Sequence, residues 1–172
     1  MQDVQPDNRM SMKLGPASLE AIEVMKQQNI QMWPEQDRQP VMPKDISVYD
    51  STELSKLFTE LTAWSNFIAG QLAAAQVDEK YLENQKDMKE AKLFFQSDGE
   101  KVKGDTVSRV KAKVNSDETI IELSNNLMKA YAYRKMMEVV FNNFERDVSL
   151  VSREITRRTN DVRSLRGDRF SP

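Results

Sequence analysis

Apolar residues recur every seven positions along two long stretches of the chain. In the first stretch the two rows are Leu54, Leu61, Ile68, Ala75, Leu82 and Phe67, Ala74, Tyr81, Met88, Phe95. Two neighbouring rows at heptad spacing make a broad apolar stripe, which is typical of a helix that touches more than one neighbour. The pattern predicts a helix from Asp50 to about Phe95.

The second stretch repeats the pattern after residue 120. Its rows are Ile120, Leu127, Arg134, Phe141, Val148, Ile155 and Leu123, Ala130, Met137, Phe144, Val151. Arg134 is the single charged residue in these rows. A repeat sustained over this length indicates a second long helix that pairs along its length.

Polar residues mark where the helices begin and where the chain turns. Asp50-Ser51-Thr52-Glu53 supplies a capping box for the first helix. Gln96 to Thr106 carries Ser97, Asp98, Gly99 and Gly104, so a turn is expected there. Val107, Val110 and Val114 indicate a short helical stretch, and Ser116-Asp117 can cap the next helix. The fold class predicted is all-α: a long antiparallel helical hairpin with coiled-coil-like heptads.

The first 45 residues differ from the rest. Pro6, Pro16, Pro34, Pro40 and Pro43 fall there. We expect an extended Pro/Met-rich arm with one short amphipathic helix, Ala17 to Ile30, that either docks or stays disordered. The domains expected are therefore the arm at 1–46, the hairpin at 47–158 and a flexible Arg-containing tail at 159–172.

A lone hairpin with such broad stripes leaves apolar rows in water, so assembly into a helical homo-oligomer is expected. The alternative is that the arm folds back over the exposed stripe. The side chains expected at the oligomer seam are Leu61, Trp64, Ile68, Leu127, Met137, Phe141, Phe144, Val148 and Val151.

Composition removes most kinds of chemistry. The chain has no cysteine and no histidine, which excludes disulfides, thiol nucleophiles, Cys/His zinc sites and imidazole triads. Five glycines form no phosphate-cradling loop. The acidic pairs, such as Glu118 with Glu122, have the spacing of ordinary solvated helices. We therefore expect no enzyme, no cofactor and no metal.

No signal peptide is visible at the N-terminus, and the longest apolar stretch, Leu61 to Val77, is too short and polar to span a bilayer. The expected location is the cytoplasm.

Charge is distributed unevenly on this chain of net charge -2. The segment from Ser152 onward is rich in arginine, whose planar guanidinium suits phosphate or carboxylate contacts. Its candidate phosphate ligands are Arg153, Arg157 and Arg158. The alternative is a solvated helix end, where cations favour the helix dipole.

A second basic cluster surrounds the predicted turn, with Phe94 and Phe95 at its centre. Its cations are Lys86, Lys89, Lys92, Lys101, Lys103, Arg109, Lys111 and Lys113. Cations interleaved with aromatic rings suit single-stranded nucleic acid, because phosphates attract cations and bases stack on rings. In the competing interpretation, the two rings cap the hairpin core and the lysines only solubilise its end.

Three segments together resemble the UvsY family, the recombination mediators of tailed phages. The first is Asp50-Ser51-Thr52 with Leu54, followed by Trp64. The second is Glu83-Asn84-Gln85-Lys86, then Ala91-Lys92-Leu93-Phe94-Phe95 and Gly99. The third runs from Asp117 through Tyr131 to Phe144. The likeness covers about residues 48–155.

The resemblance implies single-stranded DNA contact by basic residues just before the aromatic pair. Lys92 matches such a position, and Lys89 does so after a one-residue shift, whereas Glu90 stands where a cation is expected. The arm before residue 45 and the tail after Ser152 have no counterpart.

The leading hypothesis is a phage accessory protein of DNA recombination, replication and repair that acts in the cytoplasm of the infected bacterial host. It is expected to oligomerise, bind single-stranded DNA, and help to load a recombinase or remodel a single-strand-binding protein. The rival is a non-enzymatic structural protein of the virion, or an adaptor, that docks to protein partners through its arm and Arg tail.

Overall fold

The computed structural model describes residues 14–30, 39–99 and 107–167. Within these ranges the chain forms four helices and no strand: α1 (Pro16–Gln27), α2 (Ser51–Gly99), α3 (Val107–Asn115) and α4 (Glu118–Gly167). The all-α prediction is confirmed. None of the helices in this part of the chain is both long and apolar enough to cross a membrane.

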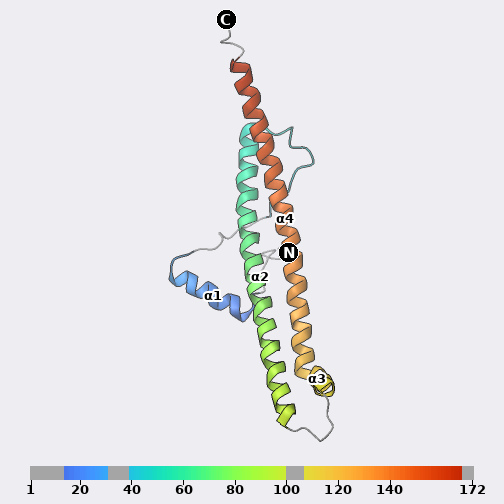
Figure 1. The fold of residues 1–172 in the computed structure, drawn as a ribbon. Helices are drawn as coiled ribbons and strands as arrows, with labels where there is room; N and C mark the ends of the chain where they lie inside the picture. The colour runs from blue at the N-terminus through green and yellow to red at the C-terminus, as the bar shows by residue number, and fades with distance from the viewer. Residues whose placement is uncertain (1–13, 31–38, 100–106, 168–172) are drawn as a thin grey trace, which may run out of the picture. The chain divides into compact units, whose positions relative to one another are not determined.

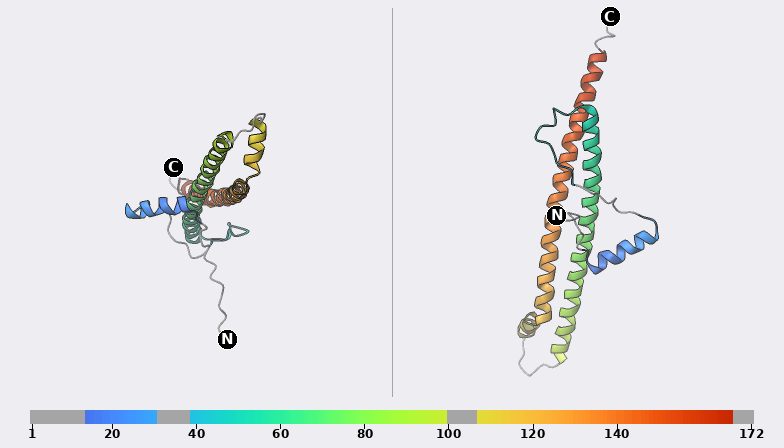
Figure 2. Two further views of the ribbon diagram at one scale, coloured as in Figure 1. Left: turned by 90° about the horizontal axis from the view of Figure 1, so that it is seen from below. Right: turned by 180° about the vertical axis from the view of Figure 1, so that it is seen from behind.

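The helices are drawn in Figure 1. The chain divides into two compact units, and α2 and α4 each contribute a segment to both. Of the described residues, unit 1 takes 39–71 and 138–167, and unit 2 takes 14–30, 72–99 and 107–137. In each unit a segment of α2 lies beside a segment of α4 (Figure 2). In unit 1, Tyr49 is bonded to Arg158 while Trp64 contacts Phe144, so the two segments run antiparallel. The predicted pairing of long helices is confirmed.

The capping box at the start of α2 forms as the sequence predicts. The Asp50 carboxylate accepts hydrogen bonds from the N–H groups of Thr52 (2.7 Å) and Glu53 (2.8 Å). The Glu53 carboxylate accepts one in return from the Asp50 N–H at 2.8 Å. These bonds satisfy N–H groups that have no partner inside the helix, which fixes the first turn.

Asp117 likewise caps α4, because its carboxylate accepts the Thr119 N–H at 2.9 Å and also the Thr119 hydroxyl. The far end of α4 differs from the prediction. The helix continues past Arg158 to Gly167, so residues 159–167 extend the helix and do not begin a separate tail. One side-chain contact supports the extension: Arg157 reaches Asp161, one turn further along, at 2.9 Å.

The core of unit 1 is built on aromatic rings. Trp64 lies 5.1 Å from Phe67 and 6.2 Å from Phe144, measured between ring centroids. All three rings are buried, together with Leu54, Leu61, Ile68 and Val151. Rings of this size bury a large apolar area each, so unit 1 buries the largest aromatic side chains of the described chain.

Unit 2 buries smaller side chains: Ala74, Ala75, Val110, Val114, Ile120 and Met137. Arg134, the charged residue in the second heptad row, is half-buried and forms an ion pair with Glu79 of α2. Its guanidinium also lies 5.3 Å from the centre of the Tyr131 ring. The positive charge of Arg134 in the apolar row is thus balanced by a carboxylate of the neighbouring helix and by an aromatic ring.

Helix α1 belongs to unit 2 and is held at its N-terminus by Asp78 of α2. The Asp78 carboxylate accepts the N–H of Gly15 at 2.7 Å, the N–H of Ser18 at 3.0 Å and the Ser18 hydroxyl at 2.7 Å. Gly15, the N-cap residue, has no side chain of its own to cap the helix. A Cβ atom there would lie 2.5 Å from Asp78 Oδ1, so the close approach requires glycine.

The helix ends earlier than the predicted Ile30. Asn29 adopts a left-handed φ of 56°. The N–H of Ile30 then bonds the Met25 carbonyl at 2.9 Å, and the N–H of Asn29 bonds the Lys26 carbonyl at 3.0 Å. This is a Schellman stop.

The residues expected at an oligomer seam lie in the chain's own core. Leu61, Trp64, Ile68, Met137, Phe144 and Val151 are buried, and Leu127, Phe141 and Val148 are half-buried. The first six are therefore covered within a single chain. Any face that meets a second chain has to use other side chains.

Candidate nucleic-acid interface

The basic end of unit 2, defined as residues 86–95 of α2 together with α3, carries the described part of the basic and aromatic cluster. Its α2 lysines have different environments. Lys86 is half-buried and pairs with Glu90, with 3.0 Å between Nζ and Oε1. Lys89 is half-buried, while Lys92 is exposed.

Lys89 acts on the start of α4. The pKa of Asp117 is lowered, first by the hydrogen bond from the Thr119 hydroxyl and also by backbone N–H groups and the positive charge of Lys89. Of the three α2 lysines, Lys92 is thus the one most open to a ligand.

The two phenylalanines lie edge to face, with 6.4 Å between ring centroids and 81° between planes. Phe94 is half-buried, whereas Phe95 is 74% exposed. The competing interpretation, in which both rings cap the hairpin core, therefore does not apply to Phe95. An exposed ring of this kind offers a face on which a base can stack.

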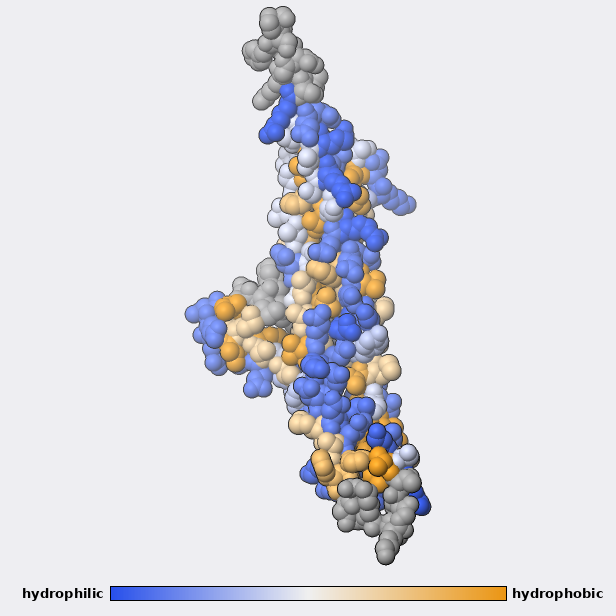
Figure 3. All heavy atoms as spheres, in the orientation of Figure 1, coloured by the Kyte–Doolittle hydropathy of each residue, from blue (hydrophilic) through white to orange (hydrophobic). Residues whose placement is uncertain are grey.

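Helix α3 separates its apolar and basic residues. Val110 and Val114 are buried, while Arg109, Lys111 and Lys113 are exposed. The helix has no acidic residue, so its outer side is positively charged. Figure 3 shows apolar side chains at the surface of this end of unit 2, among hydrophilic ones.

A groove of about 620 Å³ lies between the end of α2 and α3. Its apolar lining comes from Phe94, Phe95, Ala91 and Val114, and its polar lining from Asp87, Glu90, Lys111 and Asn115. The groove places an aromatic wall opposite a cation, which is the pairing that a nucleotide needs. It also contains two carboxylates, which limit how closely a phosphate can approach.

The sequence interpretation missed the contribution of Asp87, Glu90 and Asn115 to this groove. Helical spacing carried a signal for one of them, because Glu90 lies four residues after Lys86 and four before Phe94. Lys101 and Lys103, which were also expected in the cluster, lie outside the described residues.

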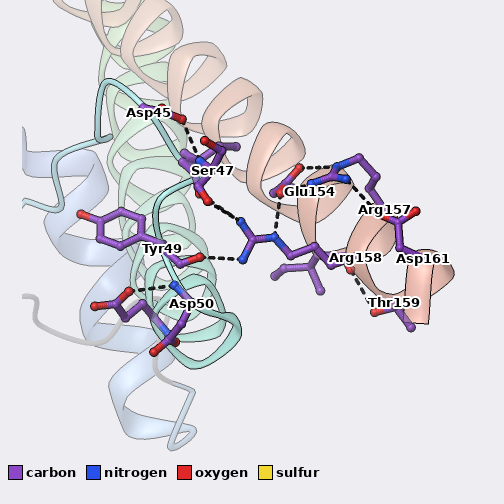
Figure 4. A network of polar contacts seen from close by, with 12 residues as sticks. Asp45, Ser47, Tyr49, Asp50, Glu154, Arg157, Arg158, Thr159 and Asp161 are labelled. Atoms are coloured by element: carbon purple, nitrogen blue, oxygen red, sulfur yellow. Dashed lines mark hydrogen bonds and ion pairs between the residues drawn. The ribbon is translucent and has the colours of Figure 1, made fainter. Parts of the chain in front are cut away.

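The arginines of the C-terminal cluster belong to unit 1, and two of them are engaged within it (Figure 4). Arg158 donates to the carbonyl oxygens of Tyr49 at 2.6 Å and Ser47 at 3.0 Å, and to Glu154 at 2.7 Å. It fastens the segment before α2 to α4. These bonds occupy the donors that a phosphate would need.

Arg157 is bonded to Glu154 through two nitrogens, at 2.9 and 2.8 Å, and to Asp161 at 2.9 Å. The hydrogen bonds from Arg157 and Arg158 lower the pKa of Glu154 to about 2. Arg153 is exposed. The pairing of Arg157 and Arg158 with acidic partners favours a structural role for both.

Comparison of the chain with protein-family models, with curated proteins and with solved structures finds no match. A functional conclusion therefore rests on the chemistry of the site itself.

Proposed function

We propose that the protein is a non-enzymatic accessory factor of phage DNA recombination. It assembles with copies of itself, binds single-stranded DNA through the basic end of unit 2, and helps to load a recombinase or displace a single-strand-binding protein. This is the role implied by the resemblance to the UvsY family. The supporting observation is the groove between α2 and α3, which is lined by Phe94 and Phe95 of α2 and by Lys111 of the basic helix α3.

The charge pattern suits weak contacts that are repeated. A chain with net charge -2 is not a strong binder of nucleic acid. Several basic ends on one assembly multiply a weak contact into useful affinity, because the second contact forms within the same complex. The single-stranded form is favoured, since stacked duplex bases do not offer their faces to an aromatic ring of the groove.

The test is a titration of a fluorescent oligo(dT) strand at two salt concentrations. Lys111→Glu with Lys113→Glu is expected to abolish binding. Lys44→Glu with Lys56→Glu, in unit 1, makes the same change of net charge at two other exposed lysines. That control is expected to weaken binding only a few-fold, through long-range charge.

Binding by the unaltered chain must also weaken as salt rises. If the chain binds no strand at either salt concentration, the DNA proposal is wrong.

The structural or adaptor role is the second candidate. Helix α1 favours it, because Leu19 and Val24 are about half exposed on a helix anchored mainly through its first turn. Such a helix can dock to a protein partner. This role is supported if the chain does not bind DNA and if changing Leu19 and Val24 to Ser abolishes its binding to a protein partner.

A further inference from the structure

The outer face of α2 in unit 2 carries an unpartnered coiled-coil seam. Its positions are Val77, Tyr81, Asn84, Met88, Ala91 and Phe95, spaced alternately by four and three residues. This alternation is the a/d pattern of a helix that packs lengthwise against another helix. The seam spans roughly 27 Å at 1.5 Å per residue.

All six positions are exposed in the single chain. Phe95 is 74% exposed, Met88 67% and Val77 43%. Ala75 and Leu82, which are buried and half-buried, lie on the face of α2 that packs inside the unit, whereas Ala91 and Phe95 of the seam also line the open groove beside α3. A continuous row of this kind in water marks an interaction surface.

We infer that this seam binds the same seam of a second copy, with the two α2 helices side by side and parallel. The inference deepens the self-association in the proposed function by naming its surface. The first argument is the match in spacing. A heptad face packs best on a helix with the same repeat, and the seam of another copy has it by identity.

Asn84 determines the direction of the pair. In a parallel pair its amide lies opposite the amide of Asn84 in the second copy, and the two can hydrogen-bond to each other. In an antiparallel pair that aligns the same six positions, Asn84 faces Met88 and its amide is left unsatisfied. A buried polar group without a partner is costly, so one asparagine in a seam selects the register in which it is paired.

The flanking charges agree with the parallel arrangement. Asp87 precedes an a position and Lys92 follows a d position, so each Asp87 lies opposite Lys92 of the other copy. The Tyr81 hydroxyl already has a hydrogen-bond partner within the chain, because the Gln85 amide donates to it at 2.7 Å. Burial of the Tyr81 side chain in the pair therefore leaves its hydroxyl satisfied. In the pair, Lys92 and Phe95 serve association, which leaves DNA contact to Phe94 and the α3 cations.

Disulfide trapping tests the inference directly, because the chain has no cysteine of its own. Ala91→Cys places one thiol at a d position, where the two copies of a parallel pair bring their Cβ atoms within disulfide range. Mild oxidation of the full chain is expected to link most chains in pairs. Asn125→Cys, exposed on α4, is the control and is expected to stay unlinked.

A second measurement is the mass in solution. Met88→Asp removes an exposed side chain, so helicity is retained while the assembly dissociates into smaller species. If Ala91→Cys links no better than Asn125→Cys, or if Met88→Asp leaves the mass unchanged, the inference is overturned.

These results separate the inference from the proposed function. If only the seam is wrong, the chain is still an oligomer, and its DNA binding is still abolished when Lys111 and Lys113 are changed to Glu. A chain that is monomeric at tens of micromolar removes the seam and the self-association together, and points to the N-terminal arm as the cover of the stripe. A linked pair of Tyr81→Cys and Ala91→Cys chains, without Ala91 self-linkage, indicates an antiparallel pair and also overturns the inference.

Discussion

One heptad row of α2 is buried in unit 1 and mostly exposed in unit 2. Phe67 in unit 1 and Ala74 at the start of unit 2 are buried, whereas Tyr81, Met88 and Phe95 further along are exposed. The residues stay apolar, so the change lies in what covers them. In unit 1, Trp64 and Phe144 fill the space around the row.

The comparison teaches that the same periodicity can serve two purposes. In unit 1 it builds a core with three aromatic rings, closed by the bonds of Arg158 to the segment before α2. In unit 2 the buried set is smaller, and aromatic and basic side chains remain at the surface. Unit 1 therefore holds the larger aromatic core, and unit 2 holds the exposed aromatic and basic side chains to which we assign binding in the proposal.

The largest effect is expected in the core of unit 1. Phe144→Ala removes a ring that is 6% exposed and packs on Trp64. Because a cavity remains, the free energy of unfolding is expected to fall by about 3–5 kcal/mol. Met136→Ala, at a 67% exposed position of unit 2 on the same helix, should change it by less than about 0.5 kcal/mol. Urea unfolding followed by circular dichroism measures both, and equal effects would contradict the contrast between the units.

Periodicity and capping chemistry made much of the fold predictable. The capping box at Asp50 and the N-cap at Asp117 are local signals, and both helices begin directly after these residues. Helix α3 was also foreseen from its three valines. The end of α4 was not, because residues 159–172 were expected to form a flexible tail. In the structure Asp161 pairs with Arg157 one turn earlier and supports the helix.

The site was harder to predict because it depends on contacts between distant residues. Asp78 caps α1 from a position 60 residues from Ser18 in sequence, and nothing near Asp78 announces this. The split of one apolar row into a buried and an exposed part likewise depends on where α4 supplies large side chains. The arginines Arg157 and Arg158 were identified as a cluster, but their acidic and carbonyl partners became visible only in the fold.

An intermediate effect is expected where α1 meets α2. Asp78→Ala removes the acceptor for Gly15 and Ser18, so the opening free energy of the α1 amides should fall by about 1–2 kcal/mol. The core of unit 1 should be unaffected. Native-state hydrogen exchange reads each helix separately. Gly15→Ala should act in the same direction, because its Cβ would displace the carboxylate, and Asp87→Ala, at an exposed carboxylate of the same helix, is the control.

The smallest effect concerns acid and the arginine contacts of unit 1. Arg157 and Arg158 lower the pKa of Glu154 from its ordinary 4.5 to about 2, chiefly through their hydrogen bonds. A depressed carboxyl pKa stabilises the fold fully above the unfolded value, and this contribution is lost as pH falls from about 4.5 toward 2. The stability of the unaltered chain should therefore decline over this window more steeply than that of Glu154→Gln, whose amide does not titrate. Urea midpoints measured at steps of pH provide the comparison. Asn142→Gln, which exchanges one exposed amide for another on α4 and removes no carboxyl group, is the control and should leave the slope as it is. Identical slopes for the Glu154→Gln variant and the unaltered chain would mean that the arginines do not hold this carboxylate in solution, and that unit 1 is closed by its aromatic core alone.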